Sequence, residues 1–211
     1  YAAGKTARTV QEARPFLPSN VSTGAHRVVV VVVSGLRYDA YDEKGMSDAA
    51  SLHRFRESLG GSGVLCKIKA ELPSLGVPNW IALLFGLRPE IHGLLGNRGP
   101  AEQPYSSLLS VARALEVPAT VVGTPWFVDL VRSQLPPLGG DGSTTASWRE
   151  YEATSARVAE HDAMRELALL KALNTSSRLV VAQLAEVDAA GMRYGASYAS
   201  GSPYSAAIRN K

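Results

Sequence analysis

Two residues that close apolar runs carry side chains able to do chemistry. Ser34 follows six consecutive valines, and Asp188 closes the run RLVVAQLAEVD. A serine hydroxyl acts as a nucleophile when a base or a metal activates it, and a carboxylate is a ligand for divalent metal ions. Both residues therefore mark the ends of expected strands as places to look for a reactive site.

Asp39 and Asp42 place two more carboxylates shortly after Ser34. Aspartate is favoured at the start of helices, where its side chain accepts hydrogen bonds from the first backbone N–H groups. We therefore interpret both as capping or solvated residues at the next helix start. A catalytic pair of zinc ions needs several carboxylate, imidazole or thiolate ligands, and Asp188 alone does not hold such a pair.

Alternating strands and helices must position these residues. Continuous or alternating apolar runs predict strands over residues 28–33, 63–72, 116–123 and 178–188. Apolar residues at helical spacing predict helices over residues 47–59, 77–87, 106–115 and 154–173. Strands separated by helices indicate an α/β fold with a doubly wound, mostly parallel sheet and helices on both faces. Ligands of such sheets bind at the carboxyl ends of the strands.

The same patterns predict which residues are buried. The valine run is typical of a central strand covered on both faces, and Cys66 is expected to be a small buried hydrophobic residue. The helix at 77–87 is expected to have Pro78 at its first position and to end near Gly86. The expected core-facing residues of two other helices are Leu52, Phe55 and Leu59, and Met164, Leu167 and Leu170.

Length and composition predict one globular domain. The chain has 211 residues, 45% of them hydrophobic and 19% charged, which is enough to bury a core of ordinary size. We expect this domain at residues 26–211, after an extended arm at residues 1–25. A stretch rich in glycine, proline and serine predicts a flexible insertion at residues 135–147.

Charge and hydropathy argue against nucleic acid as a partner and against a membrane-spanning segment. The net charge of +3 comes from scattered lysines and arginines, so nucleic acid is not an expected partner. No apolar run reaches the roughly 20 residues that span a bilayer, so no transmembrane segment is expected in this chain. The first residue is Tyr1, which suggests a processed N-terminus, and a single cysteine forms no internal disulfide.

Four stretches, taken together, resemble one enzyme superfamily. They are VVVSGLRYD, ELPSLGVPNWIALLFGLRPEIHGLLGN, PATVVGTPWF and EVDAAGMRYG, within a resemblance that runs from about residue 28 to residue 198. In this order they are similar to the alkaline phosphatase superfamily, most closely to its nucleotide pyrophosphatase/phosphodiesterase branch. The second stretch is the most specific. The resemblance implies an alkaline-phosphatase-like core, here C-terminally truncated.

The resemblance also implies a site with two zinc ions, from which this chain departs at three positions. The aspartate that binds one zinc at the end of the first strand is Ser34 here. The nucleophile, a threonine or serine at the mouth of a helix, is Gly76 here. The chain keeps Asp188 and Gly191 of a second ligand motif but has Met192 in place of its histidine, and a thioether is a poor ligand for Zn²⁺.

Further roles are implied only by the resemblance. Asn97 matches an asparagine that hydrogen-bonds the phosphate, so it is a vestigial phosphate-binding residue that can at most help to bind an anion. His92 is expected to shape the turn after a helix. An Asp-His-Gly segment and a further ligand histidine are expected downstream of Lys211.

Other serine, histidine and tryptophan residues have weaker support as parts of a site. Ser74, two residues before Gly76, is a weak candidate for a displaced nucleophile, because a serine needs an adjacent base or metal. We assign no metal to His26, which precedes the valine run, or to His53 and His161, which fall in helical patterns. Three tryptophans are interpreted as packing or interface residues, although TPWF lies in a strand-end loop and could line a residual pocket. These tryptophans are Trp80, Trp126 and Trp148.

The losses at the implied site lead to one hypothesis and two alternatives. The hypothesis is a catalytically inactive phosphodiesterase-like domain without a cofactor, which acts as a structural or accessory subunit with other proteins as its partners. We expect the assembly in an organelle such as the mitochondrion or in the secretory lumen, with any membrane association made through partners. One alternative is an active zinc-dependent phosphodiesterase or phosphotransferase whose missing ligands come from further sequence. The other is a non-catalytic nucleotide or anion receptor that uses Asn97 and the helix N-terminus near Pro78.

Overall fold

A computed structural model gives the structure of part of the chain. It describes residues 27–40, 54–55, 57–61, 66–97, 106–131, 158–199 and 201–210. The expected arm at residues 1–25 and the expected insertion at residues 135–147 lie outside these ranges. None of the helices within them is long and apolar enough to cross a membrane.

Three strands form one parallel sheet in the described part of the chain. They are β1 (Val28–Val33), β2 (Ala119–Val122) and β3 (Leu179–Leu184), and they lie in the order β1-β3-β2. Every residue of β3 is buried, as expected for a strand between two neighbours. The prediction for the valine run is therefore wrong in one respect, because β1 forms an edge of this sheet and Val31 is 45% exposed.

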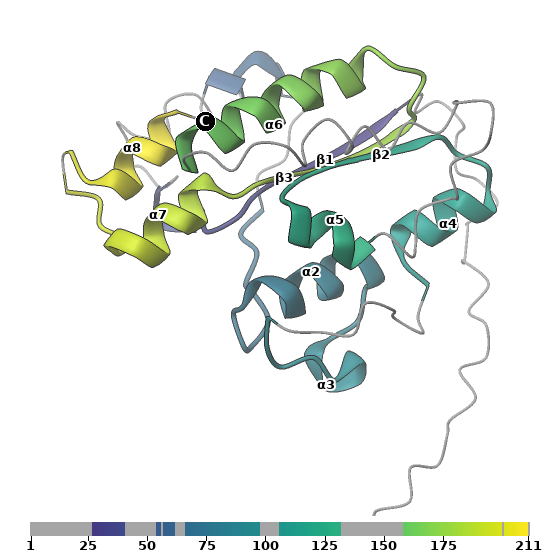
Figure 1. Cartoon of the computed structure of the whole chain (residues 1–211), viewed down its shortest axis with the longest axis horizontal. Coiled ribbons are helices and arrows are strands. Elements are labelled where there is room, and N and C mark those ends of the chain that lie inside the picture. Colours follow the sequence, from purple (N-terminus) through teal and green to yellow (C-terminus); the bar gives the residue numbers. More distant parts are fainter. Residues whose placement is uncertain are drawn as a thin grey trace, which may run out of the picture.

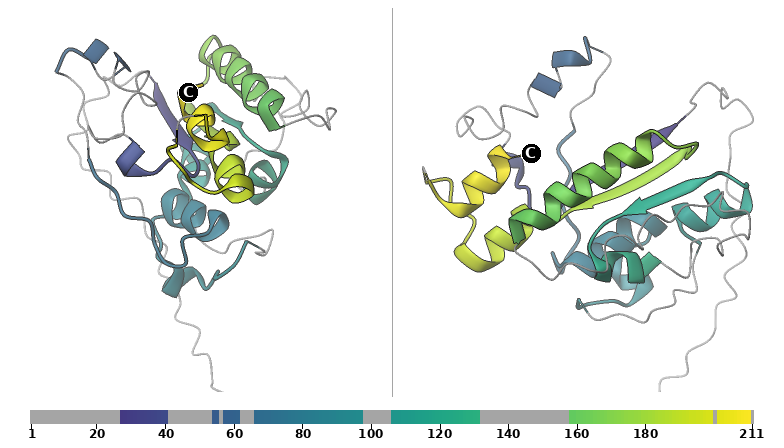
Figure 2. Two further views of the ribbon diagram at one scale, coloured as in Figure 1. Left: turned by 90° about the vertical axis from the view of Figure 1, so that its left-hand side faces the viewer. Right: turned by 45° about the horizontal axis from the view of Figure 1, so that its top comes forward.

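Helices cover both faces of the sheet, which confirms the predicted α/β fold. Figure 1 shows α6 on one side and α2, α4 and α5 on the other, and the views in Figure 2 agree. The helices are η1 (Tyr38–Ala40), α2 (Gly76–Phe85), α3 (Pro89–His92), α4 (Leu108–Ala114), α5 (Pro125–Val131), α6 (Val158–Leu173), α7 (Glu186–Tyr194) and α8 (Pro203–Arg209).

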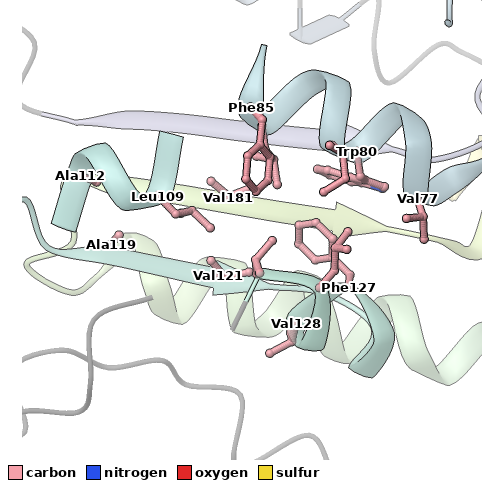
Figure 3. Close-up of a cluster of buried hydrophobic side chains, with 14 of the residues drawn as sticks. Val77, Trp80, Phe85, Leu109, Ala112, Ala119, Val121, Phe127, Val128 and Val181 are labelled. Atoms are coloured by element: carbon pink, nitrogen blue, oxygen red, sulfur yellow. The ribbon is translucent and has the colours of Figure 1, made fainter. Parts of the chain in front are cut away.

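One face of the sheet, here called the aromatic face, holds the largest core cluster (Figure 3). Trp80 of α2 and Phe127 of α5 pack with their ring centroids 4.2 Å apart. Leu109 of α4 joins them over Val121 and Val181 of the sheet. Tight packing of these rings fixes α2 and α5 relative to the sheet, and with them the loops that precede both helices.

The opposite face, here called the alanine face, is covered by α6. Ala168 and Ala172 pack against a cluster formed with Val122, Val180 and Ala182. Small side chains let a helix approach a sheet closely. The side of α6 that faces the sheet therefore carries these alanines. The predicted inward face of this helix is wrong, because three large residues, of which Leu170 is 58% exposed, lie outside. They are Met164, Leu167 and Leu170.

Two expected elements differ from the structure in their packing. Residues 66–72, the described part of the expected strand at 63–72, contain no strand, and Cys66 is exposed rather than buried. Residues 54–55 and 57–58 are helical as predicted, yet Phe55 and Leu59 are exposed, so their expected burial is wrong. Leu52 lies outside the described residues.

The ends of two helices follow local rules. α2 begins at Gly76, so Pro78 is its third residue rather than its first, and Gly86 ends it in the left-handed conformation with φ 66°. α4 begins with a capping box, in which Ser107 accepts from the N–H of Ser110 and the Ser110 hydroxyl accepts from the N–H of Ser107.

The start of β1 is fixed by Arg27. Its guanidinium donates to the carbonyl oxygens of Ser177 at 2.8 Å and Thr175 at 2.6 Å, and also to that of Leu173. Leu173 is the last residue of α6, where backbone carbonyls lack helical partners. This contact ties the edge strand to the turn between α6 and β3.

Candidate functional site

The carboxyl ends of the strands lie at one edge of the sheet, and the N-terminus of α2 lies there too. Ser34 follows β1, Thr124 follows β2 before α5, and α7 begins directly after β3. A Cβ atom built on Gly76, the first residue of α2, would lie 3.6 Å from the ring of Trp126 in α5. The edge at which the fold predicts ligand binding therefore carries the sequence-predicted residues.

Gly76, Asn97 and Trp126 come together at the N-terminus of α2. Val77 donates its N–H to the side-chain oxygen of Asn97 at 3.1 Å, and that oxygen lies 3.7 Å from the Cβ position of Gly76. Asn97 thus caps the helix, which occupies one of the N–H groups that would otherwise be available to an anion. Trp126 is 42% exposed and borders this corner.

Asn79 holds the loop that leads into α2. Its side-chain oxygen accepts from the N–H of Glu71 at 2.9 Å. Its side-chain nitrogen donates to the carbonyls of Glu71, Pro73 and Leu75 at 3.2, 3.1 and 3.0 Å. The half-buried side-chain amide of Asn79 thereby fixes the path of residues 71–75 and the position of Gly76. Asn79 lies in the stretch ELPSLGVPNWIALLFGLRPEIHGLLGN, but the sequence of this stretch did not indicate that Asn79 braces the loop.

Ser74 lies in this braced loop. Its side chain is exposed, and it makes no hydrogen bond or ion pair within the described ranges. A serine without a neighbouring base or metal stays a weak nucleophile. The described residues therefore give Ser74 no activating partner, and its role as a displaced nucleophile stays a prediction.

A second corner of the edge is formed by the end of β1 and the start of α7. Ser34 donates its N–H to the carbonyl of Leu184 at 2.8 Å. Gly35 has φ +77°, and a Cβ atom on it would lie 2.5 Å from the Cα of Asp188. Both the backbone angle and the close approach require glycine here. The end of β1 therefore rests directly on the backbone of α7.

Asp188 lies in the first turn of α7 rather than at the end of a strand. β3 ends at Leu184, so the predicted boundary was four residues too late. The carboxylate is half-buried and has no hydrogen bond or ion pair among the described residues. Burial raises its pKa above the usual value of 3.8. The part of the chain that the structure describes places no compensating charge beside this carboxylate.

The donor set at this corner does not fit a zinc ion. Met192 lies one turn after Asp188 on α7 and is 76% exposed, and Ser34 offers a hydroxyl rather than a carboxylate. Within the described ranges, no group of three or more His, Cys, Asp or Glu side chains lies close enough to hold a metal. Zinc sites in proteins use at least three such ligands.

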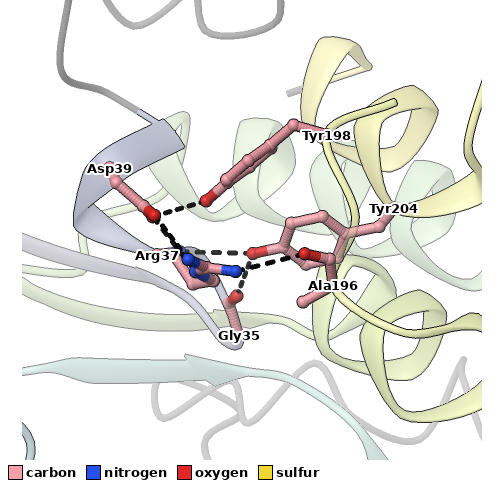
Figure 4. A network of polar contacts seen from close by, with 6 residues as sticks. All are labelled: Gly35, Arg37, Asp39, Ala196, Tyr198 and Tyr204. Carbon is pink, nitrogen blue, oxygen red and sulfur yellow. Dashed lines mark hydrogen bonds and ion pairs between the residues drawn. The ribbon is translucent and has the colours of Figure 1, made fainter. Parts of the chain in front are cut away.

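Asp39 belongs to a network that joins η1 to the segment after α7 (Figure 4). Its carboxylate accepts from the Nε of Arg37 at 3.1 Å, from a second nitrogen of Arg37, and from the hydroxyl of Tyr198 at 2.5 Å. Arg37 also donates to the carbonyl of Ala196 at 3.1 Å. Asp39 is thus engaged in this clasp of Arg37, Asp39 and Tyr198. Asp42 lies outside the described residues.

The clasp shifts the pKa values of its members. The hydrogen bond from Tyr198, followed by that from Arg37, lowers the pKa of Asp39 below 3.8. Burial and the bond to Asp39 raise the pKa of the Tyr198 hydroxyl. The ion pair is exposed, so it contributes little to folding, and its effect is to fix the segment around Tyr198 beside η1.

Tyr204 is a positioning residue that the sequence did not indicate. It is fully buried in α8, donates its hydroxyl to the carbonyl of Gly35 at 2.7 Å and accepts from the N–H of Arg37 at 3.3 Å. Tyr204 and Arg37 are 167 residues apart in the chain, so no local pattern signals the contact. Tyr204 holds the loop after β1 from the side opposite the sheet.

The remaining histidines and tryptophans lie away from this edge or outside the described part. His92 is buried and accepts the N–H of Leu94 on its Nδ1 at 3.1 Å, which agrees with a role in the turn after α3. Trp80 is buried in the aromatic face, as predicted. His26, His53, Trp148 and the side chain of His161 lie outside the described residues.

Comparison with known protein families gives one match. A model of the type I phosphodiesterase / nucleotide pyrophosphatase family matches residues 28–210. The chain belongs to this family. The comparison with curated proteins gives no match. Membership in the type I phosphodiesterase / nucleotide pyrophosphatase family confirms the superfamily expected from the four stretches. The roles of Ser34, Gly76, Asn97 and Met192 within it remain predictions.

Proposed function

We propose that this chain is a phosphodiesterase-like domain that does not catalyse hydrolysis and serves as a structural or accessory subunit of a larger assembly. The observation that carries the proposal is Gly76. The position expected for the nucleophile is the first residue of α2, and a glycine there has no atom that can attack phosphorus. A domain of this family without a nucleophile retains a folded surface but no covalent step.

Two further observations support the proposal. The corner of Ser34, Asp188 and Met192 offers one carboxylate, which is too few ligands for a catalytic zinc ion. At the other corner the side chain of Asn97 caps α2, so an amide oxygen occupies a place where phosphate oxygens would bind. Loss of the nucleophile and occupation of the helix end both disfavour turnover.

Hydrolysis of an aryl phosphodiester tests the catalytic part of the proposal. Purified chain is incubated with bis(4-nitrophenyl) phosphate, with and without added Zn²⁺, and nitrophenolate release is followed. We expect release equal to that of a protein-free control. Zinc-dependent release by the native chain would contradict the proposal. If Ser74→Ala then abolished that release, Ser74 would be a displaced nucleophile.

A substitution experiment asks whether the three departures alone account for the proposed lack of catalysis, and it tests their assignment only if the ligands expected downstream of Lys211 are also supplied. The triple variant Ser34→Asp, Gly76→Thr and Met192→His restores the side chains expected at those positions. We expect no hydrolysis from this variant, because the resemblance implies further metal ligands beyond these three positions. Turnover by the triple variant would show that these three positions suffice.

The native mass of the endogenous protein tests the subunit role. Gentle extraction followed by native electrophoresis should place this chain well above the mass of one copy. Migration as a single chain would contradict an accessory role while leaving the absence of catalysis untouched. The two parts of the proposal therefore fail independently.

A second candidate function is binding of a nucleotide without catalysis, and the exposed ring of Trp126 beside Gly76 favours it. An indole can stack on a base, and the amide nitrogen of Asn97 could contact a phosphate. Calorimetric titration with nucleotides in the absence of metal should then give heat that is lost in Trp126→Ala. No detectable heat with the native chain would dismiss this function.

A further inference from the structure

Residues 174–176 have the sequence NTS, which matches the acceptor pattern for N-linked sugars. The pattern is asparagine, any residue except proline, and then serine or threonine. It occurs once more in the sequence, as NVS at residues 20–22, which lie outside the described residues. A sugar is bulky and polar, so its acceptor has to lie at the surface of the folded chain. The surroundings of Asn174 therefore decide whether this match can carry one.

Asn174 lies in the turn between α6 and β3, and its side chain is exposed. The turn is at the amino ends of the strands, at the far end of the sheet from α7 (Figure 1). Ser176 is exposed too, and its hydroxyl makes no hydrogen bond within the described part of the chain. A sugar on Asn174 would therefore extend into solvent and stay clear of the edge that carries Gly76 and Ser34.

Hydrogen bonds hold this turn and set the direction of the Asn174 side chain. Asn174 donates its N–H to the carbonyl of Lys171 at 3.0 Å, and Arg27 donates to the carbonyl of Thr175 at 2.6 Å. The side-chain nitrogen of Asn174 donates to the carbonyl of Leu170 at 3.1 Å, its one acceptor among the described residues. An amide nitrogen carries two hydrogens. A sugar can therefore replace one of them while the other keeps the bond to Leu170.

The same bond places the amide beside an exposed apolar stripe on α6. Met164, Leu167 and Leu170 are 43%, 46% and 58% exposed, on the side of the helix away from the sheet. Residues three or four apart lie on one side of a helix, so Asn174, four residues after Leu170, continues the stripe into the turn. The first sugar on Asn174 therefore lies next to Leu170. Its apolar C–H groups can cover the end of the stripe, which removes apolar surface from water.

We propose that Asn174 carries an N-linked oligosaccharide whose first N-acetylglucosamine packs on Leu170. In the transfer, the side-chain nitrogen of Asn174 forms a bond to the anomeric carbon of the sugar and loses one proton. The donor is a lipid-diphosphate-linked oligosaccharide. Its bond between the anomeric carbon and the diphosphate oxygen breaks, and the lipid diphosphate leaves. Acceptors of such sugars are surface loops of secreted proteins, so the proposal favours the secretory lumen over the mitochondrion for this chain.

Mass spectrometry of the endogenous protein tests the site. Peptide N-glycosidase releases N-linked sugars and converts their asparagine to aspartate, which takes up heavy oxygen when the reaction is run in heavy-oxygen water. Trypsin then releases residues 172–178, ALNTSSR, in which Asn174 is the single asparagine, so residues 20–22 do not interfere. We expect labelled aspartate at position 174. Unmodified asparagine there, equal label without the glycosidase, or label confined to position 20 would overturn the proposal.

Variants at two exposed positions test the contact with Leu170. Ser176→Ala removes the acceptor pattern but keeps Asn174, and Ser176→Thr is the matched control that keeps the pattern. Expressed through the secretory pathway of one host, the Ser176→Thr chain should migrate more slowly than the Ser176→Ala chain and unfold at a higher urea concentration. This shift in midpoint should be lost when both chains also carry Leu170→Ala. Equal migration would overturn the site, and an equal shift in both backgrounds would overturn the contact.

Discussion

On one face of the sheet the rings of Trp80 and Phe127 interlock, and on the other α6 rests on the strands through Ala168 and Ala172. The aromatic face owes its stability to the large apolar area of a few side chains. The alanine face owes its stability to the short distance between helix and sheet, and the larger residues of α6 lie outside. The two faces should therefore fail in opposite ways, the first when side chains become smaller and the second when they become larger.

Removal of a ring from the aromatic face should have the largest effect. Phe127→Ala leaves a cavity between α2, α5 and the sheet, and we expect it to lower the free energy of unfolding by about 3–5 kcal/mol in urea denaturation. The neighbouring variant Trp126→Ala removes a ring that is partly exposed and should cost less than about 1 kcal/mol. Similar losses from both variants would contradict the difference in burial between Phe127 and Trp126.

Enlargement of a side chain on the alanine face should have the next largest effect. Ala168→Leu pushes α6 away from Val180 and should lower the free energy of unfolding by about 1–3 kcal/mol. The control Leu167→Ala changes an outward residue and should stay within about 0.5 kcal/mol. A large loss from Leu167→Ala combined with tolerance of Ala168→Leu would reverse the assignment of the two sides of α6.

Loss of a helix cap beside the aromatic face should have a smaller effect. Ser107→Ala removes the acceptor for the N–H of Ser110 at the start of α4 and should cost about 1 kcal/mol in thermal or urea unfolding. Ser106→Ala, one residue earlier and exposed, is the matched control and should be neutral. A neutral Ser107→Ala would indicate that packing of Leu109 alone holds α4 in place.

The smallest expected effect concerns the clasp of Arg37, Asp39 and Tyr198, which lies on neither face. The pKa of Asp39 is lowered in the folded chain, so its contribution to stability is present above pH 3.8 and is lost as the pH falls below that value. Native chain and Asp39→Asn should therefore differ slightly in unfolding midpoint at neutral pH and converge in strong acid. A difference that grows on acidification would contradict the sign of this shift.

Three of the four expected strands were readable from local patterns, because β-branched runs depend on neighbouring residues, whereas residues 66–72 of the fourth contain no strand. Predicted helices at 77–87 and 106–115 correspond to α2 and α4, and the last strand corresponds to β3. The position of β1 at an edge was not readable, because strand order depends on which segments pair across the whole chain. The inward side of α6 was predicted from apolar residues at helical spacing, whereas the side that packs on the sheet carries alanines.

The candidate site was partly predictable for the same reason. The sequence pointed to Gly76, Asn97 and Trp126 separately, and the structure places them at one helix end. It could not indicate Tyr204, whose partners Gly35 and Arg37 are distant in the chain. The chemistry of a site can thus be read from single residues, but the residues that hold it in position depend on the fold.

The spacing between Ser34 and Asp188 is set by the packing around them and not by the side chains of these two residues. Gly35 lies directly against the Cα of Asp188, so the end of β1 and the first turn of α7 cannot come closer, and Tyr204 keeps them from separating. Exchange of side chains at either position leaves this spacing unchanged. The corner therefore behaves as a rigid frame into which different donor atoms can be placed by point mutation, so its chemistry can change without any change in its shape.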